Sequence, residues 1–389
     1  MKILFGITGG IAAYKIPQVI RRLVQRGHEV EVVMTPAAAK LVSPFLLQTL
    51  SKRPVWVEDF DSRRPLAHIE LADWCDVMVV APATANTIAK LAWGMADNLL
   101  TSTFLACEKR KVIFPAMNVK MYENPLTKQN IQRLREVGCE VYEPEVGELA
   151  CGYTGRGRLA DEEVILGVVD KDPRKPLEGL RVVVSTGATV EPLDPVRYIS
   201  NFSSGKMGIA FAKRLFSLGA EILLVAGRTE VPLPLYIPSR RVQTTADMLR
   251  VIDEVMKDYD VLVMAAAPAD FRAKEMAGEK IKREGQLSLD LVSNPDIVAT
   301  IHEHYPEKRL IGFALEMKGH EGNAKEKMKR KGLEAIILNT VSSEFHPMGS
   351  DENEVVVYKA SGEEISIPRL PKERVVEKVV DFLFFGEKA

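Results

Sequence analysis

The sequence has few cysteines, almost no net charge and no long apolar run, and each shortage excludes a class of protein. Its four cysteines among 389 residues form no Cys-x-x-Cys pair, so a secreted disulfide framework is excluded. A net charge of −1 gives no general attraction to nucleic acid or to an anionic membrane surface. No segment is long and apolar enough to span a bilayer. We expect a reduced, cytoplasmic protein without nucleic-acid or membrane partners.

Apolar residues make up 46% of the sequence, which is enough to build two sizeable cores. Each half opens with a strand, a helix and a second strand. These segments are 2–7, 12–26 and 29–34 in the first half and 181–185, 209–218 and 221–226 in the second. Such βαβ units build doubly wound sheets, with ligands at the carboxyl ends of the strands. The charged, proline-containing segment 170–179 suits a linker. We therefore predict an α/β protein with two mostly parallel sheet domains, 1–172 and 173–389.

The most informative motif lies in the second half. The segment Asn201-Phe-Ser-Ser-Gly-Lys-Met-Gly208 precedes a predicted helix and follows the connection 187–197. This connection is longer than packing alone requires. Backbone N–H groups near the start of a helix suit an anionic ligand. The alternative is an ordinary loop that is rich in turn-forming residues.

Two loops of the first half also follow predicted strands. Ala81-Pro-Ala-Thr-Ala-Asn86 follows strand 76–80, and its small residues leave room for a planar ring or a phosphate. Segment 115–121 follows strand 111–114, and Met117 and Met121 suit an apolar pocket with Asn118 as its polar contact. Taken singly, each segment also fits a structural turn.

Three kinds of side chain have both a chemical and a structural interpretation. His68 stands where a helix begins, so it is a candidate catalyst or a capping residue. Cys151 lies in the glycine-rich segment 147–158, where a free thiol suits an acid, a base, a nucleophile or no chemistry at all. Lys327 and Lys331 share one helix face and would suit a triphosphate, although lysine clusters, including 280–283, usually form solvated faces.

Together these segments resemble one family along nearly the whole chain: the bifunctional coenzyme A biosynthesis proteins, in which phosphopantothenoylcysteine decarboxylase is fused to phosphopantothenate–cysteine ligase. The matching segments are Gly6–Lys15, Ala67–Trp74, Ala81–Asn86, Pro115–Asn118, Gly147–Arg158, Glu191–Met207, Ala265–Asp270, Lys280–Lys282, Asn294–Val298 and Gly312–Glu316. The chain departs from the family pattern at Pro268, at Phe271 and after Glu316.

The resemblance implies a flavodoxin-like flavoprotein domain followed by a Rossmann-like ligase domain. It implies FMN and Mg²⁺ as cofactors, phosphopantothenate, cysteine and CTP as substrates, and a homo-oligomer. The implied catalytic residues are His68, Asn118, Cys151, Asn201 and Lys280. The implied cofactor site comprises Gly9, Gly10, Ile11, Ala81, Pro82, Thr84 and Asn86. The implied CTP site comprises Ala265, Ala266, Asp270, Lys280, Pro295, Asp296, Ile297, Val298, Phe313, Lys327 and Lys331, with Asp270 also at the metal.

Two other classes of function stay open at this stage. A nicotinamide-dependent dehydrogenase would need a Gly-x-Gly-x-x-Gly turn, and the first turn, Gly6-Ile-Thr-Gly9-Gly10, lacks it. A non-catalytic flavin-binding regulatory protein would need none of His68, Asn118 and Cys151. The sequence therefore favours the bifunctional enzyme.

Overall fold

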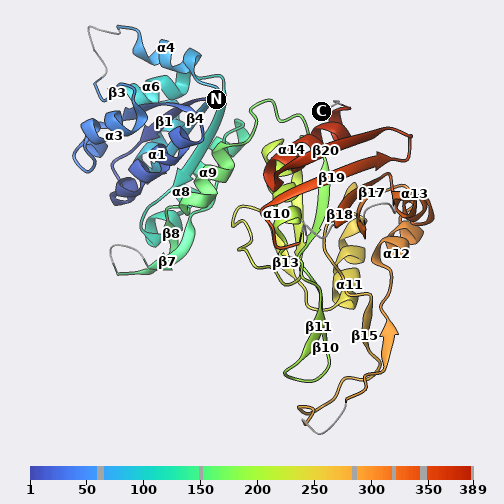
Figure 1. Ribbon diagram of the computed structural model, residues 1–389. Coiled ribbons are helices and arrows are strands. Elements are labelled where there is room, and N and C mark those ends of the chain that lie inside the picture. The colour runs from blue at the N-terminus through green and yellow to red at the C-terminus, as the bar shows by residue number, and fades with distance from the viewer. Residues whose placement is uncertain (59–64, 149–151, 283–286, 318–320, 342–347, 387–389) are drawn as a thin grey trace. The chain divides into compact units, whose positions relative to one another are not determined.

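The computed structural model describes residues 1–58, 65–148, 152–282, 287–317, 321–341 and 348–386. The chain forms two compact units, Met1–Pro173 and Arg174–Ala389, and each is described by itself (Figure 1). In the described part of the chain, no helix is both long and apolar enough to cross a lipid bilayer.

The first unit is built on a six-stranded parallel sheet with the order β3-β2-β1-β4-β5-β6. Its strands are β1 (Lys2–Ile7), β2 (Glu29–Met34), β3 (Val55–Trp56), β4 (Val77–Ala83), β5 (Arg110–Pro115) and β6 (Glu140–Val141). The central strands read as almost unbroken apolar runs, because both faces of the sheet are covered; all seven residues of β4 are buried. A separate antiparallel hairpin joins β7 (Glu145–Glu148) and β8 (Thr154–Arg158).

The helices of this unit begin where the sequence provides caps. Thr84 caps α5 (Ala85–Ala92), and Asn98 forms a capping box with Thr101 at the start of α6 (Leu99–Ala106). The helix predicted over 12–26 begins as a 3-10 turn and becomes α-helical at Ile16, because Pro17 fits the first turn of a helix. The helical elements are η1 (Ile11–Lys15), α1 (Ile16–Gln25), α2 (Pro36–Ala39), α3 (Pro44–Ser51), α4 (Ala67–Trp74), α5 (Ala85–Ala92), α6 (Leu99–Ala106), α7 (Val119–Tyr122), α8 (Pro125–Glu136) and α9 (Glu162–Val169).

The second unit is built on an eight-stranded sheet with the order β13-β12-β9-β14-β17-β18-β19-β20, in which the pairs β18–β19 and β19–β20 are antiparallel and the other pairs are parallel. The prediction of mostly parallel α/β sheets is therefore confirmed in both units. The strands are β9 (Arg181–Thr186), β12 (Glu221–Ala226), β13 (Ser239–Arg241), β14 (Val261–Met264), β17 (Arg309–Met317), β18 (Ala335–Val341), β19 (Glu352–Lys359) and β20 (Glu364–Pro371).

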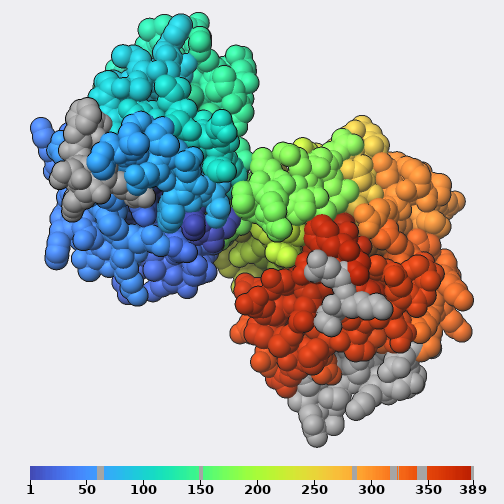
Figure 2. All heavy atoms as spheres, turned by 90° about the horizontal axis from the view of Figure 1, so that it is seen from above, coloured from blue at the N-terminus to red at the C-terminus, as the bar shows by residue number. Residues whose placement is uncertain are grey.

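Helices cover both faces of this sheet. On one face α10 (Lys206–Ser217) packs against α14 (Lys372–Val380), which continues into a π-helix (Asp381–Phe385). On the other face α11 (Thr245–Met256), α12 (Ile297–His304) and α13 (Glu321–Arg330) share one apolar core with the strands. The C-terminal segment β19–β20–α14, red in Figure 2, forms a continuous surface of this unit.

Two short hairpins interrupt the long connections of the second unit. One joins β10 (Val190–Pro192) and β11 (Tyr198–Ser200), and the other joins β15 (Phe271–Ala273) and β16 (Leu291–Ser293). The sequence pattern of the first of these segments indicates only a loop. Three-residue strands are too short to show a period in the sequence.

Candidate functional site

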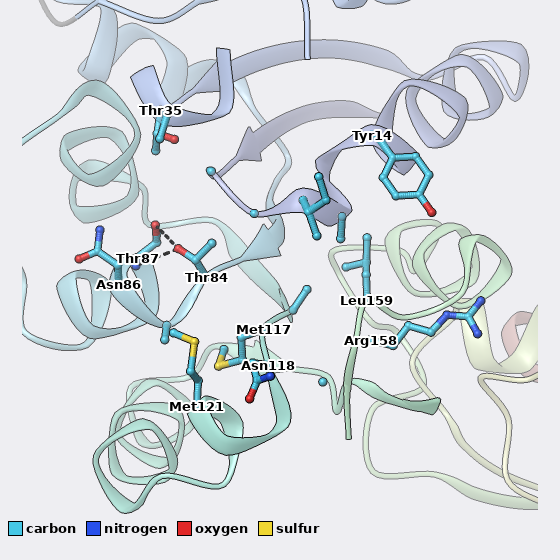
Figure 3. Close-up of a pocket in the computed structure, with 18 of the residues that line it drawn as sticks. Tyr14, Thr35, Thr84, Asn86, Thr87, Met117, Asn118, Met121, Arg158 and Leu159 are labelled. Carbon is cyan, nitrogen blue, oxygen red and sulfur yellow. Dashed lines mark hydrogen bonds between the residues drawn. The ribbon is translucent and has the colours of Figure 1, made fainter. Parts of the chain in front are cut away.

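The first unit has a cavity of about 910 Å³ at the carboxyl ends of β1, β4 and β5. This volume lies within the usual range of small-molecule and cofactor sites. Figure 3 shows side chains from several elements around it, with Thr35 on one side and Met117, Asn118 and Met121 together on another. Five of the seven predicted cofactor residues line it: Gly9, Gly10, Ile11, Thr84 and Asn86.

The other two predicted cofactor residues support the cavity wall. Ala81 is completely buried inside β4, and neither Ala81 nor Pro82 is among the described residues that line the cavity. Thr8 explains why this segment matters, since its hydroxyl donates to the carbonyl of Pro82 at 2.6 Å and accepts from the N–H of Thr84 at 3.1 Å. Thr8 therefore ties the turn after β1 to the turn after β4.

Glycine is required where the first turn meets α2. A Cβ atom on Gly9 would lie 2.5 Å from the Cβ of Ala37, which is closer than two non-bonded carbon atoms can approach. Thr35 caps α2 through a 3.2 Å bond from the N–H of Ala38, and it lines the cavity beside Pro36 and Ala37. The turn therefore exposes backbone atoms without side chains to the cavity, which allows a phosphate or a ring to approach them closely.

The opposite wall is formed by the segment after β5. Asn118 caps α7 by accepting a 2.8 Å bond from the N–H of Lys120, and Met117 donates its N–H to the carbonyl of Gly157 in β8 at 3.0 Å. The hairpin residues Glu148 and Arg158 also line the cavity. Cys151, predicted as the acid of this site, lies outside the described residues.

His68 is not gathered into the cavity of its own chain. It lies half-buried in the first turn of α4, which packs against α6. It is not among the described residues that line the cavity. The local sequence around His68 does not indicate how far this residue lies from the loops after β1, β4 and β5.

The second unit has a cavity of about 640 Å³ at the carboxyl ends of β9, β14 and β17. It gathers Asn201 and every predicted CTP-site residue except Lys280. The residues brought together are Ala265, Ala266, Asp270, Pro295, Asp296, Ile297, Val298, Phe313, Lys327 and Lys331. Residues from five separate segments of sequence thus converge on one site.

Lys331, the residue directly after α13, meets an acidic helix cap on one side of this cavity. Asp296 caps α12 by accepting from the N–H of Ala299 at 3.2 Å, and its carboxylate lies 2.7 Å from the ammonium group of Lys331. Burial favours the neutral form of Asp296, but the bonds from Lys331 and Ala299 outweigh it, so the pKa of this carboxyl lies below its usual value. Asp296 therefore stays ionised at neutral pH.

Asn201 joins two of the loops around the cavity. Its side-chain amide donates to the carbonyls of Ala267 and Pro268, both at 3.1 Å. The following helix begins close to β9, because Gly208 leaves room for Thr186; a Cβ at position 208 would lie 2.5 Å from the Thr186 hydroxyl. That hydroxyl donates to the carbonyl of Gly205 at 2.7 Å.

Lys280 stands on an exposed segment and is not among the described residues that line either cavity. The next residue, Ile281, donates its N–H to the buried carboxylate of Asp194 at 3.1 Å, and Arg197 donates to the Ile281 carbonyl. Asp194 in turn pairs with Arg197 at 3.1 Å. The segment that carries Lys280 is therefore attached to the turn between β10 and β11.

Several polar residues that line the cavity are absent from the predicted site, among them Lys206, Asn339, Asn353 and Lys372. Asn353 donates its side-chain amide to the Asn339 side chain at 2.8 Å. Lys206 belongs to the motif 201–208, so a signal for it was present. Asn339, Asn353 and Lys372 come from the last part of the chain, and only the order of the sheet brings them to the site.

No group of three or more His, Cys, Asp and Glu residues that could hold a metal ion occurs in the described ranges. Asp270, the predicted metal residue, lines the second cavity and is exposed. A single carboxylate fits Mg²⁺, which usually binds through one or two carboxylates together with substrate phosphates.

Comparison with known proteins matches both units. A family model described as "Flavoprotein" matches residues 1–172, and one described as "DNA/pantothenate metabolism flavoprotein C-terminal domain" matches residues 177–384. The Coenzyme A biosynthesis bifunctional protein CoaBC of Bacillus subtilis (strain 168) is 39% identical over 381 residues, which cover 95% of this chain and 93% of that protein.

Two further matches agree with these. The protein of the same name from Escherichia coli (strain K12) is 38% identical over 96% of this chain and 93% of its own length. A crystal structure of the C-terminal domain of a CoaBC protein is 33% identical and covers 53% of this chain and 95% of that domain, with a TM-score of 0.46. Because these two relatives are 39% and 38% identical over 95% and 96% of its length, the chain belongs to the family of bifunctional coenzyme A biosynthesis proteins.

Proposed function

We propose that domain 1–172 is an FMN-dependent phosphopantothenoylcysteine decarboxylase and that domain 173–389 is a CTP-dependent phosphopantothenate–cysteine ligase. The observation that carries this proposal is the convergence of the predicted ligand residues on one cavity in each unit. The ligase product, phosphopantothenoylcysteine, is then the substrate of the decarboxylase.

In the first cavity, Gly9 and Gly10 bring bare backbone to the ligand, and Thr84 and Asn86 offer hydrogen bonds. Met117 and Met121 supply apolar contact for a ring. These residues fit FMN, which when bound supplies the reversible oxidation that makes decarboxylation feasible. Asn118 would hold the substrate carboxylate, and Cys151 would donate the proton of the final reduction.

The position of His68 supports a homo-oligomer. His68 would assist the oxidative half-reaction, yet it is not among the described residues that line the cavity of its own chain. The same unit exposes large apolar side chains, with Phe45 80% exposed and Trp93 64% exposed. Exposed apolar groups of this size are typical of interaction surfaces. A second copy packed there would bring its own His68 to the cavity.

In the second cavity, Lys327 and Lys331 would hold the triphosphate of CTP, and Asp270 would hold Mg²⁺ against it. Asn201 would bind the acyl-cytidylate that forms when CTP activates the carboxylate of phosphopantothenate. Phe313 is held edge-to-face by Phe211, with ring centroids 5.8 Å apart, so it offers a fixed apolar wall. Lys280 would act when the cysteine amine displaces CMP.

The whole proposal is tested with the purified chain, phosphopantothenate, cysteine, CTP and Mg²⁺. We expect the products CMP, pyrophosphate, CO₂ and phosphopantetheine, which mass spectrometry would detect. Cleavage within 170–178 should then leave a piece 1–172 that retains flavin and decarboxylates added phosphopantothenoylcysteine, and a piece 173–389 that releases CMP. Folded protein that releases neither CMP nor CO₂ would refute the proposal, and flavin on the C-terminal piece would refute the domain assignment.

The flavin cradle has its own test in Gly9→Ala. The added Cβ would overlap Ala37, and overpacking of this kind costs about 1–3 kcal/mol, which corresponds to a loss of about 5- to 150-fold in flavin affinity. The measurement is flavin absorbance per chain after gel filtration. Gly147→Ala is the control, because a Cβ there meets the Arg158 side chain at an ordinary 3.5 Å. Equal flavin content in both variants would contradict the cradle.

A further inference from the structure

Two cysteines lie in contact inside the first unit. The sulfur atoms of Cys75 and Cys107 are 3.9 Å apart, although 32 positions separate the two residues in the chain. Both side chains belong to the apolar core of this unit, and both are free thiols in the structure. Neither residue is among the described residues that line the cavity. The proposed reactions therefore give this pair of thiols no task.

The fold brings the backbone of the two cysteines together at one end of the sheet. Cys75 directly follows α4 and Cys107 directly follows α6, and these two helices pack against each other. The chain then enters the neighbouring parallel strands β4 and β5, in which Val77 pairs with Arg110. Neighbouring strands lie about 4.8 Å apart, and disulfides join residues whose Cα atoms are about 4.4–6.8 Å apart. The entrances to these two strands therefore suit a disulfide.

The surroundings make Cys107 the more acidic of the two thiols. A hydrogen bond from Cys75 lowers the pKa of Cys107 below its usual value, and a hydrogen bond from the backbone of Lys109 and the charges of Lys111 and Lys109 add to this effect against the opposing effect of burial. The same contact between the thiols, followed by burial, raises the pKa of Cys75. A thiolate with a second thiol beside it is the arrangement found in cysteines that respond to oxidants.

Burial restricts which oxidant can reach this pair. Cys75 and Cys107 are each only 1% exposed. Glu108 and Lys109, which follow Cys107 directly, are exposed, so the Cys107 thiol lies close beneath the surface. Hydrogen peroxide is little larger than a water molecule and can pass such a cover, whereas a peptide disulfide is too bulky. Hydrogen peroxide is therefore the class of oxidant that fits the site.

We propose that hydrogen peroxide converts Cys75 and Cys107 into an intramolecular disulfide, which ties the end of α4 to the end of α6. The Cys107 thiolate attacks one peroxide oxygen and becomes a sulfenic acid, and hydroxide leaves. The Cys75 thiol then attacks the oxidised sulfur, and its proton leaves with the sulfenic oxygen as water. In total, two thiols lose two electrons and two protons, and one peroxide becomes two water molecules. A dithiol reductant returns both electrons and both protons.

The disulfide would stabilise the first unit, because it restricts the unfolded chain between the two cysteines. It would also fix the end of the helix whose first turn carries His68. The usual stabilisation by one disulfide, in a domain of this size, corresponds to a rise of about 5–15 °C in Tm. This inference is independent of the reactions that the two units catalyse.

The first measurement is a peptide map of the full chain before and after a short treatment with hydrogen peroxide. Free thiols are blocked in denaturant, and the chain is then digested without reductant. We expect one cross-linked pair of peptides that carries Cys75 and Cys107 and is lighter by two hydrogen atoms than the two peptides together. Dithiothreitol should abolish it. The same pair found in untreated protein would also support the proposal.

The second measurement is calorimetric unfolding of the full chain. Peroxide should raise the Tm of the first unit by about 5–15 °C, and dithiothreitol should reverse the rise. Cys75→Ala and Cys107→Ala should each abolish the rise, because each variant lacks one partner. Cys139→Ala is the matched control, since Cys139 is a free, buried cysteine of the same core, and it should keep the full rise. If an alanine variant does not fold, the peptide map of the wild type still decides the matter.

Several results would overturn the inference. Cys75 and Cys107 that stay free thiols after peroxide treatment would show that the pair does not react. A sulfinic acid on Cys107 without a cross-link would show that Cys75 does not capture the oxidised sulfur. A disulfide to Cys139, to Cys151 or to a second chain would assign the chemistry to another pair. A Cys75–Cys107 disulfide without a change in Tm would refute the stabilising tie between α4 and α6.

Discussion

Replacing His68 with Asn is expected to stop CO₂ release from phosphopantothenoylcysteine, while CMP release by the second unit continues. Asparagine keeps a polar side chain at the start of α4 but cannot take or give a proton at neutral pH. General acid–base groups typically contribute about 10²- to 10⁴-fold to a rate. The measurement is CO₂ evolution, with flavin absorbance followed on mixing; the flavin should stay oxidised. Near-normal CO₂ release would leave His68 with a structural role only; it does not cap α4, whose N-cap residue is Leu66.

Cys151→Ser is the contrasting variant for this experiment. A hydroxyl is a far weaker acid than a thiol, so this variant should release CO₂ but form little phosphopantetheine. The two variants would then block opposite ends of the same reaction. Normal phosphopantetheine formation would give Cys151 a structural role only.

The location of His68 adds a second experiment. Because His68 is outside the described lining of its own chain's cavity, chains that carry His68→Asn should be rescued by chains that carry Asn118→Ala. Co-expression of the two variants would create sites with an intact His68 from one copy and an intact Asn118 from the other. Mixed protein without recovered CO₂ release would contradict a site shared between copies.

Removing either Lys327 of α13 or Lys331, which directly follows this helix, is expected to raise the CTP requirement of the ligase. Each of Lys327→Ala and Lys331→Ala removes a charge-assisted contact to the triphosphate, with an expected rise of about 10- to 100-fold in KM for CTP. Lys331→Ala also leaves Asp296, which Lys331 contacts at 2.7 Å, as an ionised carboxylate facing the nucleotide. The measurement is CTP titration of CMP release, with kcat reported separately.

Lys329→Ala is the control for this pair, since Lys329 is an exposed residue of the same helix that is not among the described residues lining the cavity. Its KM for CTP should match the wild type. If the Lys327 and Lys331 variants also match the wild type, that pair is a solvated helix face, and the triphosphate must bind elsewhere.

The sequence by itself predicted the fold class, several central strands and most of the residues that line the two cavities. Strands β1, β2 and β12 begin and end at the predicted residues. Strands that are buried on both faces of a parallel sheet are continuous apolar runs, and glycine and polar residues mark where each run ends. Loops at the carboxyl ends of such strands necessarily share one edge of the sheet. The family resemblance placed Asn201 and Phe313 in the ligase half, and this shared edge explains why residues so distant in sequence both line the second cavity.

The tertiary structure alone decided which side chains reach the cavities. Local patterns report the period and the ends of each element, but not which helix packs beside which. The packing of α14 against α10 places Lys372 beside Lys206, and the bonds of Ile281 to Asp194 and Arg197 place Lys280 on a segment outside the described cavity lining. These contacts join residues far apart in the chain. They follow from the burial of apolar faces and of single charged groups, which short stretches of sequence do not encode.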